Sequence, residues 1–199
     1  MSVFASNGDN SDAEALEFAP KLTLTNVDSG ENIELETTIN TEIVNSNFRS
    51  AGVTQYKTDL SAGVPAEVFS NGGQKNADSW DGSYSFQMFS TIYYSTITVN
   101  NMEYYRLDAV HAHVNRDDPG VQILDNHFSY GMTGVNPSGY PVDLNNWYYF
   151  ASGSYGGVNT NYTESVSLDA VGAIGSSLYV LARRGNSNVW TAQLDNSLQ

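Results

Sequence analysis

Three histidines are the residues whose spacing could most directly support chemistry. His111 and His113 form an H-x-H pair inside an apolar run, and His127 follows in the next such run. Alternate side chains of a β-strand share a face, so the pair could bind zinc if a third imidazole joined it, leaving a position open for water. With a two-residue turn at Pro119-Gly120, His127 falls on the opposite face, and only an odd-length loop or a bulge would gather all three. We therefore expect partly exposed strand histidines, and no metal or other cofactor.

Paired carboxylates are the second chemistry open to this chain. Two acids roughly 5 to 10 Å apart are the main requirement of glycoside hydrolysis, and the chain has 22 acidic residues. None of these acids stands in a recognisable catalytic motif. A secreted glycan hydrolase is therefore the alternative function, and it would draw its pair from Asp78, Asp81, Glu103, Asp108, Asp125 and Glu164.

Motifs for other chemistries are absent from the sequence. There is no Cys, which excludes a disulfide framework, a thiolate metal site and a cysteine nucleophile. There is also no G-x-S-x-G nucleophile elbow and no Walker-type phosphate loop. Asp117-Asp118 could share a calcium ion with backbone carbonyls, but a solvated acidic turn is the simpler interpretation. The sequence thus favours a binding protein over an enzyme.

Aromatic doublets are the most informative feature. They occur at Tyr93-Tyr94, Tyr104-Tyr105 and Tyr148-Tyr149. Successive side chains of a strand point to opposite faces, so each doublet should bury one ring and expose the other. Two-residue turns at Asn100-Asn101 and Pro119-Gly120 would create a three-strand meander with one face rich in β-branched residues and the other rich in aromatic ones.

We expect the β-branched face to be the core, because Val and Ile pack with little rotamer loss on a pleated surface. The aromatic face would then bind a sugar ring or a protein, since flat rings offer broad, stiff contact area. The predicted ligand-binding residues are Tyr94, Tyr105, Tyr130, Trp147 and Tyr149.

Three alternatives to an exposed aromatic face stay open. The N-terminal strands or the segment 61–83 could cover it. Bulges could shift the register, so that each face mixes inside and outside residues. The aromatic face could also fill the core itself, which would leave Tyr93 and Tyr104 exposed.

Short β-strands are the elements that would position these residues. Apolar and polar residues alternate over 33–39, and strand-like runs recur at regular spacing over 83–194, separated by Asn, Asp, Gly and Pro. About nine to eleven strands with tight turns predict an all-β fold, an antiparallel β-sandwich that could take a jelly-roll form. We expect one such domain over 18–199, with 61–83 as its longest irregular stretch.

The N-terminal residues point to export. Residues 1–17 are polar and acidic with little to bury, which predicts a flexible tail. Val3-Phe4-Ala5 before Ser6 resembles the end of a signal peptide, so this tail could also hold the remnant of one. The cysteine-free, lysine-poor composition is likewise typical of a secreted or cell wall-associated bacterial protein.

The charge limits the range of partners. Against 22 acidic residues there are 8 basic ones, a formal net charge of -14, which disfavours binding to nucleic acid or anionic lipid. No apolar run approaches the roughly 20 residues that span a bilayer. We therefore expect a non-enzymatic protein that binds a glycan, a cell-wall polymer or a protein at a cell surface. The oligomeric state is left open.

Overall fold

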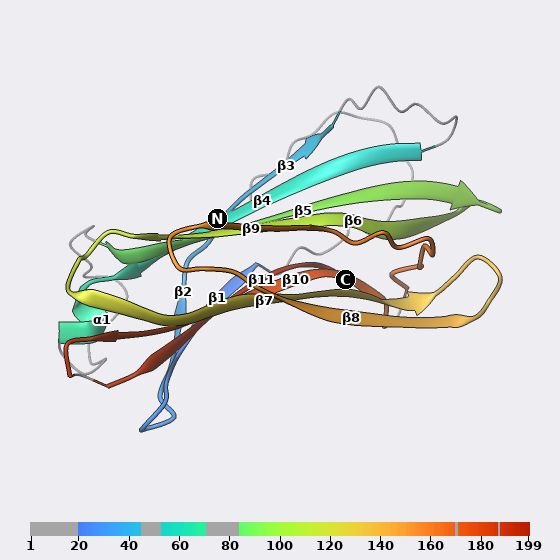
Figure 1. Ribbon diagram of the computed structural model, residues 1–199. Helices are drawn as coiled ribbons and strands as arrows, with labels where there is room; N and C mark the ends of the chain where they lie inside the picture. Colours follow the sequence, from blue (N-terminus) through green and yellow to red (C-terminus); the bar gives the residue numbers. More distant parts are fainter. Residues whose placement is uncertain (1–19, 45–52, 71–83, 170, 187) are drawn as a thin grey trace.

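The computed structural model describes residues 20–44, 53–70, 84–169, 171–186 and 188–199. In these segments eleven β-strands form two antiparallel sheets that pack face to face (Figure 1), so the predicted all-β sandwich is confirmed. The predicted tail, residues 1–17, lies outside the described segments. No helix within them is long and apolar enough to cross a membrane.

The two sheets are named A and B. Sheet A contains, in spatial order, β2 (Asn32–Leu35), β1 (Lys21–Asn26), β11 (Trp190–Leu198), β10 (Ala173–Arg184), β7 (Val121–Val135) and β8 (Pro141–Tyr149). Sheet B contains β3 (Thr38–Ile43), β4 (Val53–Pro65), β5 (Tyr84–Val99), β6 (Met102–Arg116) and β9 (Tyr155–Asn159). A short helix, α1 (Glu67–Ser70), follows β4. Strand β4 thus includes residues 61–65, which the sequence had suggested were irregular.

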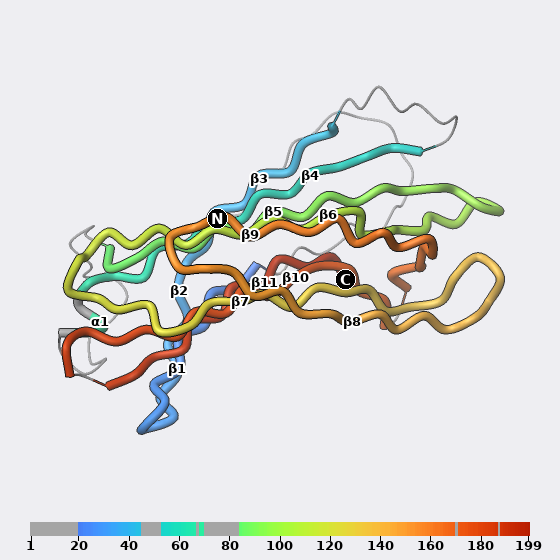
Figure 2. Tube along the Cα trace, in the orientation of Figure 1, coloured from blue at the N-terminus to red at the C-terminus, as the bar shows by residue number. Residues whose placement is uncertain are grey.

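The connectivity of sheet B is mainly a meander. Strands β3, β4, β5 and β6 are neighbours both along the chain and in the sheet, whereas a jelly roll is built from two Greek keys. Figure 2 shows the chain then passing from β6 to β7 in the other layer, and returning from β8 to β9. Because β9 pairs with β6, the edge strands β8 and β9 lie on the same side of the sandwich.

The β5–β6 hairpin has the predicted register. Val99 pairs with Met102 and Ile97 with Tyr104. Asn100 and Asn101 form the turn with φ values of 52° and 63°. A two-residue turn with positive φ at both positions matches the right-handed twist of the flanking strands, and Asn tolerates that conformation better than most residues.

The predicted extension of this meander to β7 is wrong. The turn itself forms, since the amide of Val121 donates to the carbonyl of Asp118 over 3.1 Å. It carries the chain from sheet B to sheet A, however, where β7 pairs with β10 and β8. The edge of β6 that β7 would have used pairs with β9 instead.

A β-bulge in β6 explains why neither predicted face is the core as a whole. Tyr93 pairs with Ala109 but Tyr94 pairs with Leu107, so Asp108 is an extra residue. The bulge reverses the alternation along β6. The buried residues include Tyr105 and Leu107 on one side of the bulge and Val110, Ala112 and Val114 on the other. The alternative in which each predicted face mixes inside and outside residues is the one observed.

One apolar cluster fills the space between the sheets. Sheet A contributes residues such as Leu22, Leu178 and Leu194, and sheet B contributes residues such as Met88 and Ile92. Where a strand such as β11 buries alternate side chains, its remaining side chains lie on the outer face of the sheet.

Candidate functional site

Tyr94 and Tyr105 do not form an exposed platform, so this prediction is wrong. Only 4% of Tyr94 and 5% of Tyr105 is exposed. The ring of Tyr94 stacks on Tyr56, with centroids 5.2 Å apart, and contacts Tyr105 at 6.3 Å. Burial raises the pKa of Tyr94 to about 12, and burial together with a hydrogen bond to Glu103 raises the pKa of Tyr105 further. Tyr94 continues the regular alternation that buries Ile92 on β5, and Tyr105 packs beside it on β6 before the bulge. The face of these segments that was expected outside is therefore the core.

Tyr93 and Tyr104, the other rings of these two doublets, differ in how far they are buried. Tyr104 is also buried, so the expected alternation fails at Tyr104-Tyr105. Tyr93 is half-buried on the outer face of sheet B, where its ring meets the imidazole of His111 edge-on, with centroids 5.3 Å apart.

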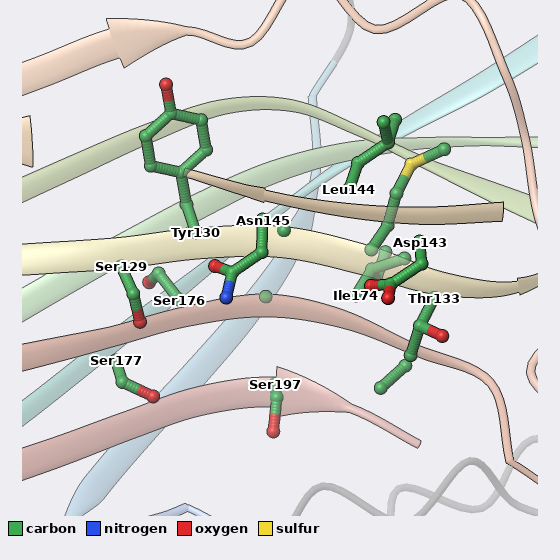
Figure 3. A pocket seen from close by; sticks show the side chains of 14 residues that line it. Ser129, Tyr130, Thr133, Asp143, Leu144, Asn145, Ile174, Ser176, Ser177 and Ser197 are labelled. Atoms are coloured by element: carbon green, nitrogen blue, oxygen red, sulfur yellow. The ribbon is translucent and has the colours of Figure 1, made fainter. Parts of the chain in front are cut away.

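Tyr130 also points toward the core rather than the solvent. Its ring is half-buried and contacts Phe128 at 5.9 Å and Tyr162 at 6.4 Å. Figure 3 shows Tyr130 and Leu144 directed away from the side chain of Asn145. The exposure predicted for Tyr130 is therefore wrong, because β7 belongs to sheet A and its even-numbered residues over 126–132 face sheet B.

The third doublet behaves as predicted. Tyr148 is half-buried and stacks on Phe128, with centroids 5.2 Å apart. Tyr149 points the other way and is 67% exposed, and Trp147, on the same outer face, is 51% exposed. The exposure predicted for Trp147 and Tyr149 is thus confirmed. Their binding of a ligand stays a prediction.

Two further rings join Trp147 and Tyr149 on the outer face of sheet A and make a group of four. Tyr149, His127 and Tyr179 are cross-strand partners on β8, β7 and β10. The imidazole of His127 lies 4.9 Å from the Tyr149 ring, 5.2 Å from the Tyr179 ring and 5.3 Å from the Trp147 ring. We call His127, Trp147, Tyr149 and Tyr179 the aromatic shelf.

A carboxylate sets the orientation of the central imidazole. Nδ1 of His127 lies 3.1 Å from Oδ2 of Asp125, and because a carboxylate can only accept, Nδ1–H is the donor. In the neutral imidazole this leaves Nε2 as an acceptor. The shelf therefore combines flat rings with a hydrogen-bond acceptor between them.

A groove adjoins the shelf along the same strands. Two glycines, Gly131 on β7 and Gly175 on β10, are register partners at its base. A Cβ at Gly131 would lie 2.2 Å from the carbonyl oxygen of Leu144, and one at Gly175 would lie 2.3 Å from that of Asn196. Glycine is thus required at both positions, and the missing side chains leave an open groove of about 230 Å³.

Polar side chains line the groove (Figure 3). The hydroxyl-bearing ones include Ser129, Thr133, Ser177 and Ser197, and Asp143 and Asn145 come from β8. Trp147 is the register partner of Ser129, which places the shelf directly beside this polar row. The residues lining the groove include one acid and no Lys or Arg. The arrangement can accept hydrogen bonds from, and donate them to, a hydroxyl-rich molecule.

The histidines and acids singled out for catalysis are spread over the molecule. His111 and His113 lie on the outer face of sheet B, whereas His127 lies on sheet A. Among the described residues no group of three potential metal ligands comes together.

Each described candidate acid has a different partner. Glu103 accepts from Tyr105, Asp108 pairs with Arg106, Asp125 accepts from His127, and Glu164 accepts from Asn136. The four acids thus pair with four different residues and not with one another in these contacts, and Asp78 and Asp81 lie outside the described segments.

Two members of the shelf, His127 and Tyr179, were not among the residues predicted to bind. Tyr179 is 30 residues beyond Tyr149 in the sequence. No local sequence pattern in β8 or β10 predicts that both strands pair with β7, which is what brings the two rings to the same imidazole.

Comparison of the chain with protein-family models, with curated proteins and with solved structures finds no match.

Proposed function

We propose that this protein binds an uncharged glycan on the outer face of sheet A, without catalysing a reaction. The observation that carries the proposal is the exposed pair Trp147 and Tyr149 beside a polar groove. Rings of this kind can cover the apolar face of a sugar, while hydroxyl and amide groups nearby bond its hydroxyls.

Rigidity of the site supports the proposal. Tyr149 is backed by His127, and His127 by Tyr179, and all three stand on paired strands. Because these rings are held in place before a ligand arrives, binding costs little side-chain entropy.

Charge favours an uncharged polymer. Asp125 lies beside the shelf and Asp143 beside the groove, and the whole chain carries a formal net charge of -14. Phosphate, sulfate or uronate groups would therefore be repelled. The same composition supports, as part of this proposal, a secreted or cell-surface protein that meets a cell-wall polymer.

The proposal is tested by titrating the protein with hydroxyethylcellulose, galactomannan and glycol chitin while recording tryptophan fluorescence. Trp147 lies on the shelf, so ligand binding there should change its emission. We expect the Tyr149→Ala variant to bind at least about tenfold more weakly, which corresponds to about 1.4 kcal/mol. The Trp147→Ala variant should lose most of the signal.

The control variant is Tyr140→Ala, which removes an equally exposed tyrosine from the region between β7 and β8. It should titrate like the wild type, and polygalacturonate, an anionic polymer, should bind more weakly than the uncharged ones. A wild type that binds none of the three uncharged polymers, or a Tyr149→Ala variant that titrates like it, would overturn the proposal. A protein partner would then be the function to pursue.

A further inference from the structure

A second row of rings lies on the outer face of sheet B. Phe89, His113 and Tyr155 are cross-strand partners on β5, β6 and β9. The His113 imidazole stacks on the Tyr155 ring, with centroids 4.1 Å apart and an interplanar angle of 11°, and on the Phe89 ring at 5.9 Å and 25°. Tyr155 is 80% exposed. We call these three residues the second stack.

The second stack repeats the construction of the aromatic shelf. In both, an exposed tyrosine stands on an edge strand, with an imidazole behind it and a further aromatic ring behind the imidazole. In both, Nδ1 of the imidazole donates to a fixed oxygen, the carboxylate of Asp125 for His127 and the carbonyl of Ser154 for His113, the latter at 3.2 Å. Each imidazole is therefore held in one orientation against the ring of its exposed tyrosine.

The surroundings of the second stack are polar. Gly157 pairs with His111, and a Cβ there would lie 2.9 Å from the imidazole, so glycine is what allows the His111 ring to lie against β9. Thr91 donates to Asp59 on the neighbouring strand. The one nearby lysine, Lys57, pairs with both Glu42 and Asp59, so this face has no excess of positive charge among these described residues.

We propose that the second stack is a second glycan-binding site, centred on Tyr155, and that the protein joins two chains of an uncharged polysaccharide. This inference rests on the proposed function of the shelf. The same ligand class follows from the shared construction, a preorganised tyrosine ring among hydroxyl, imidazole and carboxylate groups.

The fold directs the two sites away from each other. Tyr149 ends β8 in sheet A and Tyr155 begins β9 in sheet B, and the chain crosses one side of the sandwich between them (Figure 1). Their side chains project from the two opposite outer faces. One protein can therefore hold one polymer chain on each face, and each bound chain raises the effective concentration of protein at the other.

A two-step capture experiment tests this inference. One of the three uncharged polymers is immobilised, the protein is bound and washed, and the same polymer carrying a fluorescent label is added. Wild-type protein should retain the labelled polymer. Tyr149→Ala and Tyr155→Ala should each still bind the immobilised polymer through the remaining site but retain less than about one tenth of the labelled one. The double variant should fail at the first step, and Tyr140→Ala should behave like the wild type.

The outcomes separate the two proposals. If the wild type does not bind the immobilised polymer, the proposed function fails and the second site with it. If it binds but captures no labelled polymer, or if Tyr155→Ala captures as much as the wild type, only the second site is overturned. A dimer with one site per chain gives the latter result, because Tyr155 would then be irrelevant to capture. Unchanged melting temperatures of the variants exclude misfolding as the cause of any loss.

Discussion

The side-chain amide of Asn196, on β11 in sheet A, donates to the backbone carbonyl of Ser90, on β5 in sheet B, over 3.0 Å. Both residues are buried. The hydroxyl of Ser90 also lies 3.0 Å from that of Ser176 on β10. A small polar network thus connects the two sheets inside an apolar core, where a lost partner is costly because water cannot replace it.

Removing the amide should destabilise the protein. We expect Asn196→Ala to lower the free energy of unfolding by about 1–3 kcal/mol, since the carbonyls of Thr58 and Ser90 both lose a donor. Urea denaturation measures the change. Gln193→Ala, on the outer face of the same strand, is the matched control and should stay within about 1 kcal/mol of the wild type. Equal effects of the two variants would show that the network contributes nothing to stability.

The two described tryptophans should respond in opposite ways to truncation. Trp190 is buried in the core and Trp147 is exposed on the shelf. Trp190→Ala should cost about 3–5 kcal/mol of stability, because it leaves a cavity. Trp147→Ala should cost less than about 1 kcal/mol. Thermal melting of both variants checks this, and a large loss for Trp147→Ala would mean that the shelf is needed for folding.

The β5–β6 turn offers a test of backbone conformation. At Asn101 the φ value is 63°, a conformation that glycine adopts without strain and alanine does not. Asn101→Gly should keep or slightly raise the melting temperature, whereas Asn101→Ala should lower stability by about 1 kcal/mol. If the two variants have the same melting temperature, the turn is too mobile for its φ values to affect stability.

Local patterns in the sequence predicted the fold class and the hairpin at Asn100-Asn101, because alternation and turn residues act over a few neighbouring positions. They could not show that β7 joins β10 rather than β6. The pairing of β7 depends on β9, a short strand with two glycines that pairs with the edge of β6.

Strand alternation predicted which side chains share a face of the sheet, but not which face is the core. It holds along β8, so Trp147 and Tyr149 were correctly expected to be exposed. Alternation is also regular along β5 up to Tyr94, but the face expected outside is the one that packs in the core. In β6 the extra residue Asp108 reverses the alternation, so Tyr105 before it and Val110 after it are both buried. A bulge needs only one additional residue and leaves no strong local signal, so the sequence pattern could not locate it.

The buried tyrosines of sheet B predict loss of stability at alkaline pH. Burial raises the pKa of Tyr94 to about 12, and its ordinary value of 10.0 applies to the unfolded chain. A group whose pKa is higher in the folded state contributes stability that is fully present below the unfolded pKa and is lost as the pH rises toward the folded one. For Tyr94 that window lies between about pH 10 and pH 12, and the loss is at most about 3 kcal/mol.

Tyr94→Phe removes this titration. The wild type has the advantage of the Tyr94 hydroxyl at about pH 9, and we expect the difference in unfolding free energy between wild type and variant to shift toward the variant by about pH 11. Urea denaturation at both pH values measures the shift. Tyr149→Phe, which removes an exposed hydroxyl, is the control and should show a smaller change. A pH dependence that is the same for Tyr94→Phe and the wild type would mean that the Tyr94 hydroxyl reaches water in the folded protein, and that the end of the sandwich near Tyr56 and Tyr105 opens readily.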